Sequence, residues 1–406
     1  MAKDRKIRYY RWRGINPTGK RLSGVMLGFQ EQEIRAKLSE QQIIVKKLKR
    51  HQPSTLSKRR NQLRAEDVSA ITRQLATMVN AGVPVVQALK LIAQSHHKAE
   101  ARATLTMVSN QVEAGSSLAK ALHTSSPLFD DFYCDLVATG EQTGHLAEAF
   151  NRLATYREKN EAMRKKVVKA MIYPTMVTLT AIIVTVMMLI FVIPQFANIF
   201  KSFGADLPWF TQRIIDTSNL MISHGPYLAF GLLLAIIFAI TAYRKSDKHK
   251  LRVHRFLLVI PIMGPIMRKA AIARFARTLA TTFSSGIPLL SGLEAAGRTA
   301  GNRFIEQAIE GAHGNTAAGM PLHLALRHSG VFPELMLQMV MIGEESGSID
   351  DMLNKIAITY EDDVDNTVDN LGKILEPLII LFLGGLIGGL LIAMYMPVFK
   401  LMSVVG

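Results

Sequence analysis

Three long runs of apolar residues divide an otherwise charged chain. The first run, 170–196, contains no charged residue, and the third run, 374–399, is uncharged from Pro377 onward. The second run, 226–243, is shorter and carries a tyrosine near each end, which is typical of a membrane interface. Because a helix needs roughly 20 apolar residues to cross the hydrocarbon layer, we expect three transmembrane helices at these positions.

The segments that precede the first and third runs have apolar residues at helical spacing. In the first of them, Val68, Ile71, Leu75 and Met78 recur at intervals of three or four residues. We therefore expect a helical bundle of about six helices at 65–169 and a second one at 244–373. The remaining segments, 197–225 and 400–406, are predicted to be a loop and a short tail.

Residues 1–64 have a pattern of their own. Two short β-type runs on either side of Pro17–Lys20 predict a hairpin, and a short helix and a further strand follow up to residue 50. The segment carries 18 Lys and Arg against 4 Asp and Glu, a net charge of 18 − 4 = +14 out of the chain's +16. Such a charge can attract anionic lipid, nucleic acid or an acidic protein surface, and it does not choose among them.

Lysine and arginine near the ends of the apolar runs predict the orientation in the membrane. They are dense just before 170–196 and just after 226–243, whereas the connection 197–225 has only Lys201 and Arg213. By the positive-inside rule the N-terminus and 244–373 are cytoplasmic, and 197–225 and 400–406 are periplasmic. The acidic stretch before 374–399 fits this rule less well. The predicted fold class is an all-α membrane protein with two cytoplasmic six-helix bundles, three transmembrane helices and a small α+β N-terminal module.

The chain also contains an internal duplication. Residues 71–89 match 275–293 at an offset of 204, and the segment 140–144 (GEQTG) matches 343–347 (GEESG) at an offset of 203. The match continues into the first and third apolar runs, so that the second run connects two copies of one unit. The positions that recur, with the glutamate that precedes the second of the span-entry prolines, are our candidates for structural or interaction roles: Arg73, Gly82, Pro84, Gly115, Gly140, Glu141, Gly144, Pro174 and Pro194 in the first copy, and Arg277, Gly286, Pro288, Gly319, Gly343, Glu344, Gly347, Glu376, Pro377 and Pro397 in the second.

Catalytic chemistry finds little support in the sequence. Glu141 and Glu344 recur but lack nearby partners for a metal, so we expect them to serve helix ends. Cys134 is the only cysteine and is expected to be a packed small side chain. There is no P-loop motif, and none of the apolar runs carries an ionisable residue at its middle. We therefore predict no catalytic residue, metal or cofactor. Pro174 and Pro377 either start a membrane helix or lie within a helix that continues from the bundle.

The repeated Gly-x-Pro and Gly-Glu motifs, the proline at each span entry and the three runs resemble the inner-membrane platform proteins of type IV pilus assembly and type II secretion. The resemblance covers nearly the whole chain. It implies a scaffold in the bacterial inner membrane and not an enzyme. It also implies that the bundles contact hexameric extension and retraction ATPases, that the membrane part contacts pilin or prepilin subunits, and that other inner-membrane alignment proteins and further copies of the chain are partners. Anionic lipid is expected near the basic segments.

Other functions are compatible with parts of the pattern. A type II secretion protein F, which assembles a pseudopilus, would have the same architecture, although the overall resemblance favours the pilus member. A transporter or channel also contains repeats, but it would need polar residues within the membrane. A DNA-binding role would rest only on the basic N-terminal segment, for which lipid contact is the simpler explanation.

Overall fold

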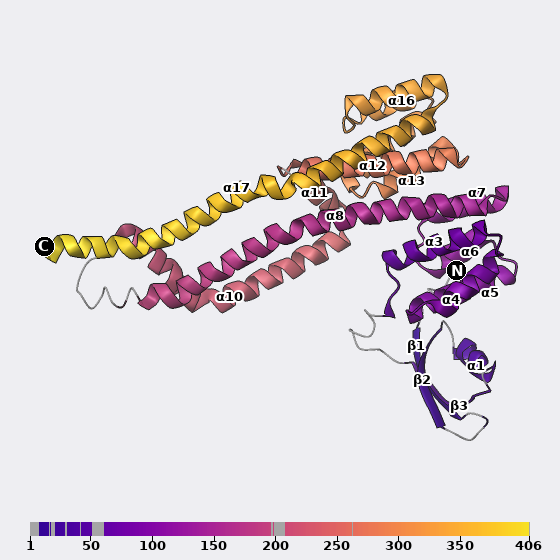
Figure 1. Cartoon of the computed structure of the whole chain (residues 1–406), viewed down its shortest axis with the longest axis horizontal. Coiled ribbons are helices and arrows are strands. Elements are labelled where there is room, and N and C mark those ends of the chain that lie inside the picture. The colour runs from indigo at the N-terminus through magenta and orange to yellow at the C-terminus, as the bar shows by residue number, and fades with distance from the viewer. Residues whose placement is uncertain are drawn as a thin grey trace.

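The computed structural model of the chain describes residues 8–15, 17, 21–28, 31–40, 42–50, 61–195, 198, 208–261 and 263–405. The described part is mostly helical. Very long helices run along the length of the molecule, and the shorter helices gather at one end of them (Figure 1). The expected predominance of helix is confirmed, and the apolar segments lie at the end opposite the short helices.

The N-terminal module is a small α+β unit, as expected. Its strands are β1 (Arg8–Ile15), β2 (Arg21–Gly28) and β3 (Ile44–Arg50), in the antiparallel order β2-β1-β3. Helix α1 (Glu31–Glu40) packs on one face, where Tyr10, Ile34 and Leu38 form a buried core. The hairpin turn at 18–20 and the linker at 51–60 lie outside the described residues.

The first copy of the repeat folds around one apolar core. Leu75, Leu89, Leu105, Tyr133 and Phe150 are fully buried in it, one from each of five helices. The helices that share this core are α3 (Ala65–Asn80), α4 (Val85–Ser95), α5 (Ala99–Glu113), α6 (Leu118–Ser125), α7 (Asp131–Thr143) and the first part of α8 (Leu146–Met187).

The second copy has a separate core of the same kind. Leu279, Leu293, Ile309, Leu326 and Leu353 are among its buried side chains. Its helices are α11 (Asp247–Val259), α12 (Met263–Ser284), α13 (Leu289–Thr299), α14 (Arg303–Ala317), α15 (Leu322–His328), α16 (Glu334–Ser346) and the first part of α17 (Ile349–Val405).

Helix boundaries repeat at the offsets found in the sequence. Helix α4 begins at residue 85 and α13 at 289, which is 289 − 85 = 204. Helix α8 begins at 146 and α17 at 349, which is 349 − 146 = 203. The duplication therefore extends to the ends of individual helices, and a position in one copy has a defined counterpart in the other.

The apolar runs belong to helices that are much longer than the runs themselves. The stretches Leu146–Gln195 and Ile349–Met396 are each long and apolar enough to cross a membrane, and the first includes the π-helical turn η1 (Met188–Val192). The predicted loop at 197–225 is helical from residue 209, because α10 (Trp209–Lys245) begins there, and the predicted tail at 400–406 is helical up to Val405. Both predictions were wrong for these helical residues, and in the case of α10 contacts with other helices explain the difference. Side chains of α10 bond to the neighbouring long helices, with Thr211 Oγ1 donating to the carbonyl of Ala393 at 2.8 Å.

Pro174 and Pro377 lie inside continuous helices. Helix α8 runs from residue 146 to 187 through Pro174, and α17 runs from 349 to 405 through Pro377. The sequence left open whether these prolines start a membrane helix, and the structure excludes that alternative. Each bundle is therefore joined to an apolar segment by one unbroken helix.

Candidate functional site

Helix α3 of the first bundle and its counterpart α12 of the second are each fastened to the long helix of the same copy by an arginine. Arg73 of α3 donates from Nε and Nη2 to the two carboxylate oxygens of Glu158, at 2.7 and 2.6 Å. Arg277 of α12 donates in the same way to Glu361, at 2.8 Å for both bonds. Bidentate pairs of this kind fix geometry as well as charge. We call these contacts the arginine clamps.

The partners of the arginines also recur, which the sequence comparison overlooked. Glu158 and Glu361 are separated by 361 − 158 = 203 residues, as are Asn151 and Asn354, whose side-chain oxygens accept from Arg73 and Arg277. Extending the offset of 203 past residue 144 would have found both pairs.

The electrostatics of the clamps follow from these contacts. The hydrogen bonds that Arg73 donates to Glu158 are the main cause that raises the pKa of Arg73, and the same bonds lower the pKa of Glu158. Burial acts to raise the pKa of Glu361, but hydrogen bonds from Arg277 and Lys159 outweigh it, so that this pKa is lowered. All of these shifts favour the charged pairs.

The recurring glutamates cap the start of a neighbouring helix. The carboxylate of Glu141 on α7 accepts from the backbone N–H of Leu118, the first residue of α6, at 2.9 and 3.0 Å. Glu344 on α16 accepts from the N–H of Leu322 and His323 at the start of α15, at 2.6 and 2.9 Å. A carboxylate at this place satisfies free N–H groups and complements the helix dipole. This is the role at helix ends that the sequence predicts.

The recurring glycines allow close approach and tight turns. A Cβ added at Gly140 would lie 2.6 Å from Ala149 Cβ, and one at Gly343 would lie 2.9 Å from Ile349 Cα, so both positions exclude a side chain. Gly82 and Gly286 have φ of +84° and +81°, a left-handed conformation that glycine adopts without strain. Pro84 and Pro288 stand immediately before α4 and α13, and glycines 115, 319, 144 and 347 also have positive φ just after helices.

Lysines of α8 face carboxylates of α17 along a seam that joins the two copies. Lys159 Nζ lies 3.0 Å from Glu361, and Lys166 Nζ lies 3.1 Å from Asp365 and 3.0 Å from Asp369. Lys166 and Asp369 are counterparts in the repeat, since 369 − 166 = 203. The acidic stretch before the third apolar run, which fits the positive-inside rule poorly, thus neutralises the basic stretch before the first.

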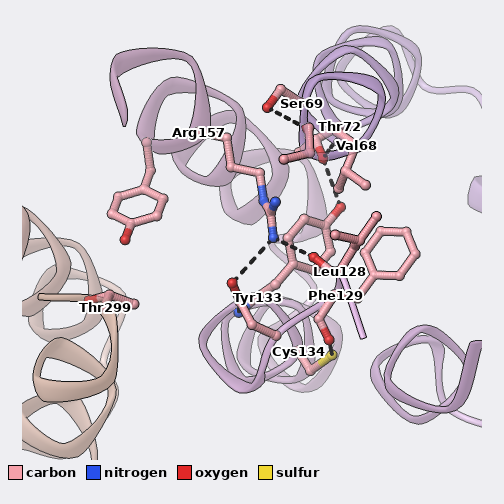
Figure 2. Close-up of polar contacts among 12 residues, drawn as sticks. Val68, Ser69, Thr72, Leu128, Phe129, Tyr133, Cys134, Arg157 and Thr299 are labelled. Carbon is pink, nitrogen blue, oxygen red and sulfur yellow. Dashed lines mark hydrogen bonds and ion pairs between the residues drawn. The ribbon is translucent and has the colours of Figure 1, made fainter. Parts of the chain in front are cut away.

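A polar cluster holds α3, α7 and α8 of the first bundle together next to this seam. Tyr133 OH is 3.0 Å from Thr72 Oγ1, and the Arg157 guanidinium lies 5.0 Å from the Tyr133 ring centre and donates to the Leu128 carbonyl at 2.8 Å. Burial raises the pKa of Tyr133 to about 12, so that it remains a neutral hydroxyl. Figure 2 shows the cluster, with Thr299 of the second bundle facing it.

The two bundles meet beside a cleft of about 970 Å³. Asp130, Asp135 and Arg164 of the first copy and Arg274 and Arg298 of the second line it. Ionic pairing occupies several of these charges, including Arg157 with Asp130 and Arg298 with Asp131. The cleft marks the contact between the copies.

The described parts of the chain hold no cluster of side chains that could bind a metal ion. Within those residues, no three His, Cys, Asp or Glu side chains lie together as a metal site would require. Cys134 is buried, its thiol lies 3.6 Å from the Phe129 carbonyl, and burial raises its pKa to about 12. It therefore stays a thiol and packs as the sequence predicted.

Comparison with known proteins assigns the family. The model of the type II secretion system protein F family matches residues 71–194 and 275–397, which are the two copies described above. The chain belongs to the type II secretion system protein F family. The family matches begin 275 − 71 = 204 residues apart and end 397 − 194 = 203 residues apart, so the domain of this family is the repeated unit.

Relatives named for type IV pilus assembly or for type II secretion match most of the chain. The type IV pilus assembly protein TapC of Aeromonas hydrophila is 46% identical over 99% of this chain and 97% of its own length. The type IV pilus assembly protein PilC of Pseudomonas aeruginosa is 41% identical over 84% of this chain and 91% of its own length. The type II secretion system protein F of Vibrio cholerae is 31% identical over 97% of this chain and 98% of its own length.

Proposed function

We propose that this protein is an inner-membrane platform of type IV pilus biogenesis, which couples cytoplasmic ATPases to the polymerisation of pilin. The higher identity to relatives named for type IV pilus assembly than to the secretion protein supports the pilus assignment. The observation that carries the mechanism is the pair of unbroken helices, α8 and α17, each of which runs from a bundle into an apolar segment.

The arginine clamps are the first link in the mechanical coupling. A force on either bundle reaches α8 or α17 through a bidentate ion pair and a shared apolar core, without a flexible linker. The lysine–carboxylate seam holds the two long helices beside each other at the membrane entry. Movement of the bundles would therefore displace the membrane helices together. This is what a scaffold needs if it is to lift or release a subunit held in the membrane.

The proposed topology keeps the boundaries from the sequence. Residues 1–64 form the basic module and linker, the bundles are 65–169 and 244–373, and the three transmembrane segments are 170–196, 226–243 and 374–399. The N-terminus is cytoplasmic and the C-terminus periplasmic. Helix α10 starts near the far ends of α8 and α17 and runs back toward the bundles, as a return crossing would, which supports this arrangement (Figure 1). Both bundles then lie on the cytoplasmic side, where ATP is available.

The proposed partners follow from this topology. The bundles contact the hexameric extension and retraction ATPases, and the membrane helices contact pilin or prepilin. Other inner-membrane alignment proteins complete the assembly, anionic lipid lies near the basic segments, and the chain forms a homo-oligomer. The protein is a scaffold that catalyses no reaction and holds no cofactor.

A charge-reversal experiment in a deletion strain tests the proposal. We expect deletion to abolish surface pili, measured by electron microscopy and by sheared pilin, and the wild-type gene to restore them. Lys166→Glu should reduce piliation because it places a third carboxylate beside Asp365 and Asp369, and Asp369→Lys in the same chain should recover part of it. Lys165→Glu is the matched control, since Lys165 pairs with Glu161 of its own helix and not with α17. A deletion strain that still assembles pili would overturn the assignment.

The alternative is a protein F that serves type II secretion. The identity of 31% to the Vibrio cholerae protein supports this second candidate. The same deletion strain separates the two functions, because loss of secreted enzymes with normal pili would favour secretion. A transporter or channel remains disfavoured for lack of ionisable groups within the apolar runs.

A further inference from the structure

The contact between the two bundles is built from one part of each repeat. The α12–α13 turn of the second copy packs on the first bundle, where Ile287 and Ala295 belong to the first bundle's apolar core and are each 8% exposed. Arg152 of α8 donates to Ser284 and Ser285 at the end of α12, at 2.5 and 2.9 Å. The second copy thus contributes a hairpin, and the first copy contributes a surface on α7 and α8.

Because the unit is duplicated, the chain has a second hairpin. It is the turn between α3 and α4, and the counterpart of Ala295 is Leu91, since 295 − 204 = 91. Leu91 is 44% exposed, whereas Ala295 is 8% exposed. The larger apolar side chain is therefore the uncovered one, which is the reverse of what burial energy favours in an isolated chain.

The chain likewise has a second receiving surface, on α16 and the start of α17. The counterparts of Phe132 and Thr139 are Leu335 and Ile342, at an offset of 203. Phe132 is 3% exposed and lines the cleft between the bundles, and Thr139 lies in a groove with Ser284 and Ser285. Leu335 is 56% exposed and Ile342 is 50% exposed.

The polar contacts have counterparts of matching chemistry. Arg152 corresponds to Lys355, and Ser284 corresponds to Asn80, so a cation still faces a side-chain oxygen. Asp131, which pairs with Arg298, corresponds to Glu334, and Arg298 corresponds to Gln94, so a carboxylate still faces an N–H donor. Two polar pairs are therefore expected in the repeated contact, Lys355 with Asn80 and Glu334 with Gln94.

We propose that a second copy of this chain docks its α3–α4 hairpin on the α16–α17 surface of the first copy, head to tail, and so repeats the internal contact between molecules. The charge and apolar complementarity just described selects this occupant over an unrelated protein, because the counterparts of both surfaces already contact one another within the chain. This docking does not depend on whether the protein serves a pilus or a secretion system.

The geometry of the membrane is compatible with this contact. Helices α8 and α17 run in the same direction, and Lys166 pairs with its own counterpart Asp369, so the two copies of the repeat stand at the same level (Figure 1). The rotation and shift that carry the first copy of the repeat onto the second therefore preserve the helix direction. The same movement applied to the second copy gives the position of the first copy of a neighbouring chain, which stands upright in the same membrane. A head-to-tail contact of this kind closes into a ring when its rotation permits.

Crosslinking between two differently tagged full-length chains tests the proposal. One chain carries Gln94→Cys and the other Glu334→Cys, both with Cys134→Ala to remove the native thiol, and a short bismaleimide is added to membranes that contain both. We expect a mixed crosslinked dimer. The control replaces Glu334→Cys with Ile358→Cys. Ile358 is exposed too, but it lies on α17, and its counterpart Thr155 bonds to Arg73 within its own bundle. We expect at least a fivefold lower yield of mixed dimer from the control, while a yield equal to that of the test pair would overturn the proposal.

Substitutions in the apolar contact provide the second measurement. Leu335→Asp with Ile342→Asp should reduce the mixed dimer at least fivefold and lower the molar mass of the purified assembly. The melting temperature should not change, because both side chains are exposed. Lys355→Glu on one chain should weaken the crosslink, and Asn80→Lys on the other should restore it. Head-to-tail docking would be refuted if no mixed dimer formed, or if two Gln94→Cys chains crosslinked equally well. It would also be refuted if Glu334→Cys captured a different protein and not a second copy, or if the Asp variants associated fully.

Discussion

The two arginine clamps have the same chemistry in different surroundings, which allows one to serve as the control for the other. In the second copy the side chains of Arg277 and Glu361 are 13% and 18% exposed, whereas in the first copy those of Arg73 and Glu158 are 37% and 46% exposed. The perturbation is Arg277→Met, which keeps much of the apolar stem, with Arg73→Met as the matched variant. We expect the second copy to lose much more stability than the first.

The magnitudes follow from burial. An exposed ion pair is worth about 0–1 kcal/mol, so Arg73→Met should cost about 0.5 kcal/mol. Removing one partner of a buried pair costs roughly 3–5 kcal/mol, but Glu361 keeps Lys159 at 3.0 Å and some exposure to water. We therefore expect about 2 kcal/mol for Arg277→Met. At about 1.4 kcal/mol per factor of ten, this corresponds to a roughly 30-fold loss of protection against hydrogen exchange, compared with about twofold for Arg73→Met.

Hydrogen exchange with mass spectrometry on the full-length protein in detergent is the assay. Peptides from α12 should lose protection in Arg277→Met, and peptides from α3 should change little in Arg73→Met. Equal losses in the two variants, or a larger loss in α3, would refute this explanation of the difference. Such a result would mean that burial does not determine how much each clamp contributes to stability.

The pH dependence gives an independent check on the same clamp. The pKa of Glu361 is lowered from its ordinary value of 4.5 by Arg277 and Lys159, against the opposing effect of burial. A carboxyl group with a lowered pKa in the folded state stabilises that state above the ordinary value, and this contribution disappears as the pH falls through the lowered value. The difference between wild type and Arg277→Met should therefore be constant above pH 4.5 and shrink in more acidic solution.

Three further outcomes test two of the repeated positions and the buried cysteine. Glu344→Ala removes the cap of α15 and should cost about 1–2 kcal/mol, seen as faster exchange in residues 322–328 with little change in α6. Gly343→Ala forces a Cβ to within 2.9 Å of a backbone atom and should cost about 1–3 kcal/mol in thermal or urea unfolding. Gly311→Ala is the control, because a Cβ there meets nothing within 4 Å, and it should stabilise α14 by up to about 1 kcal/mol. Cys134 should resist maleimide until the protein is unfolded, because burial raises its pKa to about 12; rapid labelling of the native protein would contradict its placement.

The candidate site was only partly predictable from sequence. The recurrence of Glu141 and Glu344 drew attention to them, and their lack of ligand partners predicted a structural role. The helix that each of them caps could not be predicted, because the cap joins α7 to α6 and α16 to α15 across a turn of the chain. Arg73 and Arg277 were found as a pair, but their partners lie more than 70 residues away in sequence, and only folding brings them together.

The sequence by itself determined the duplication, the helical character of both copies, the N-terminal strands and the family. These features depend on periodicity, glycine and proline positions and local charge, which act over a few residues. Tertiary structure alone decided that Pro174 and Pro377 lie within continuous helices, that the segment from Trp209 is helical, and that the acidic stretch of α17 faces the lysines of α8. The physical reason is that a polar connection or a run of like charge is stabilised by partners on other elements, here Ala393 for Thr211 and Asp369 for Lys166, which lie far away in sequence. The folded arrangement of the two copies determines those partners.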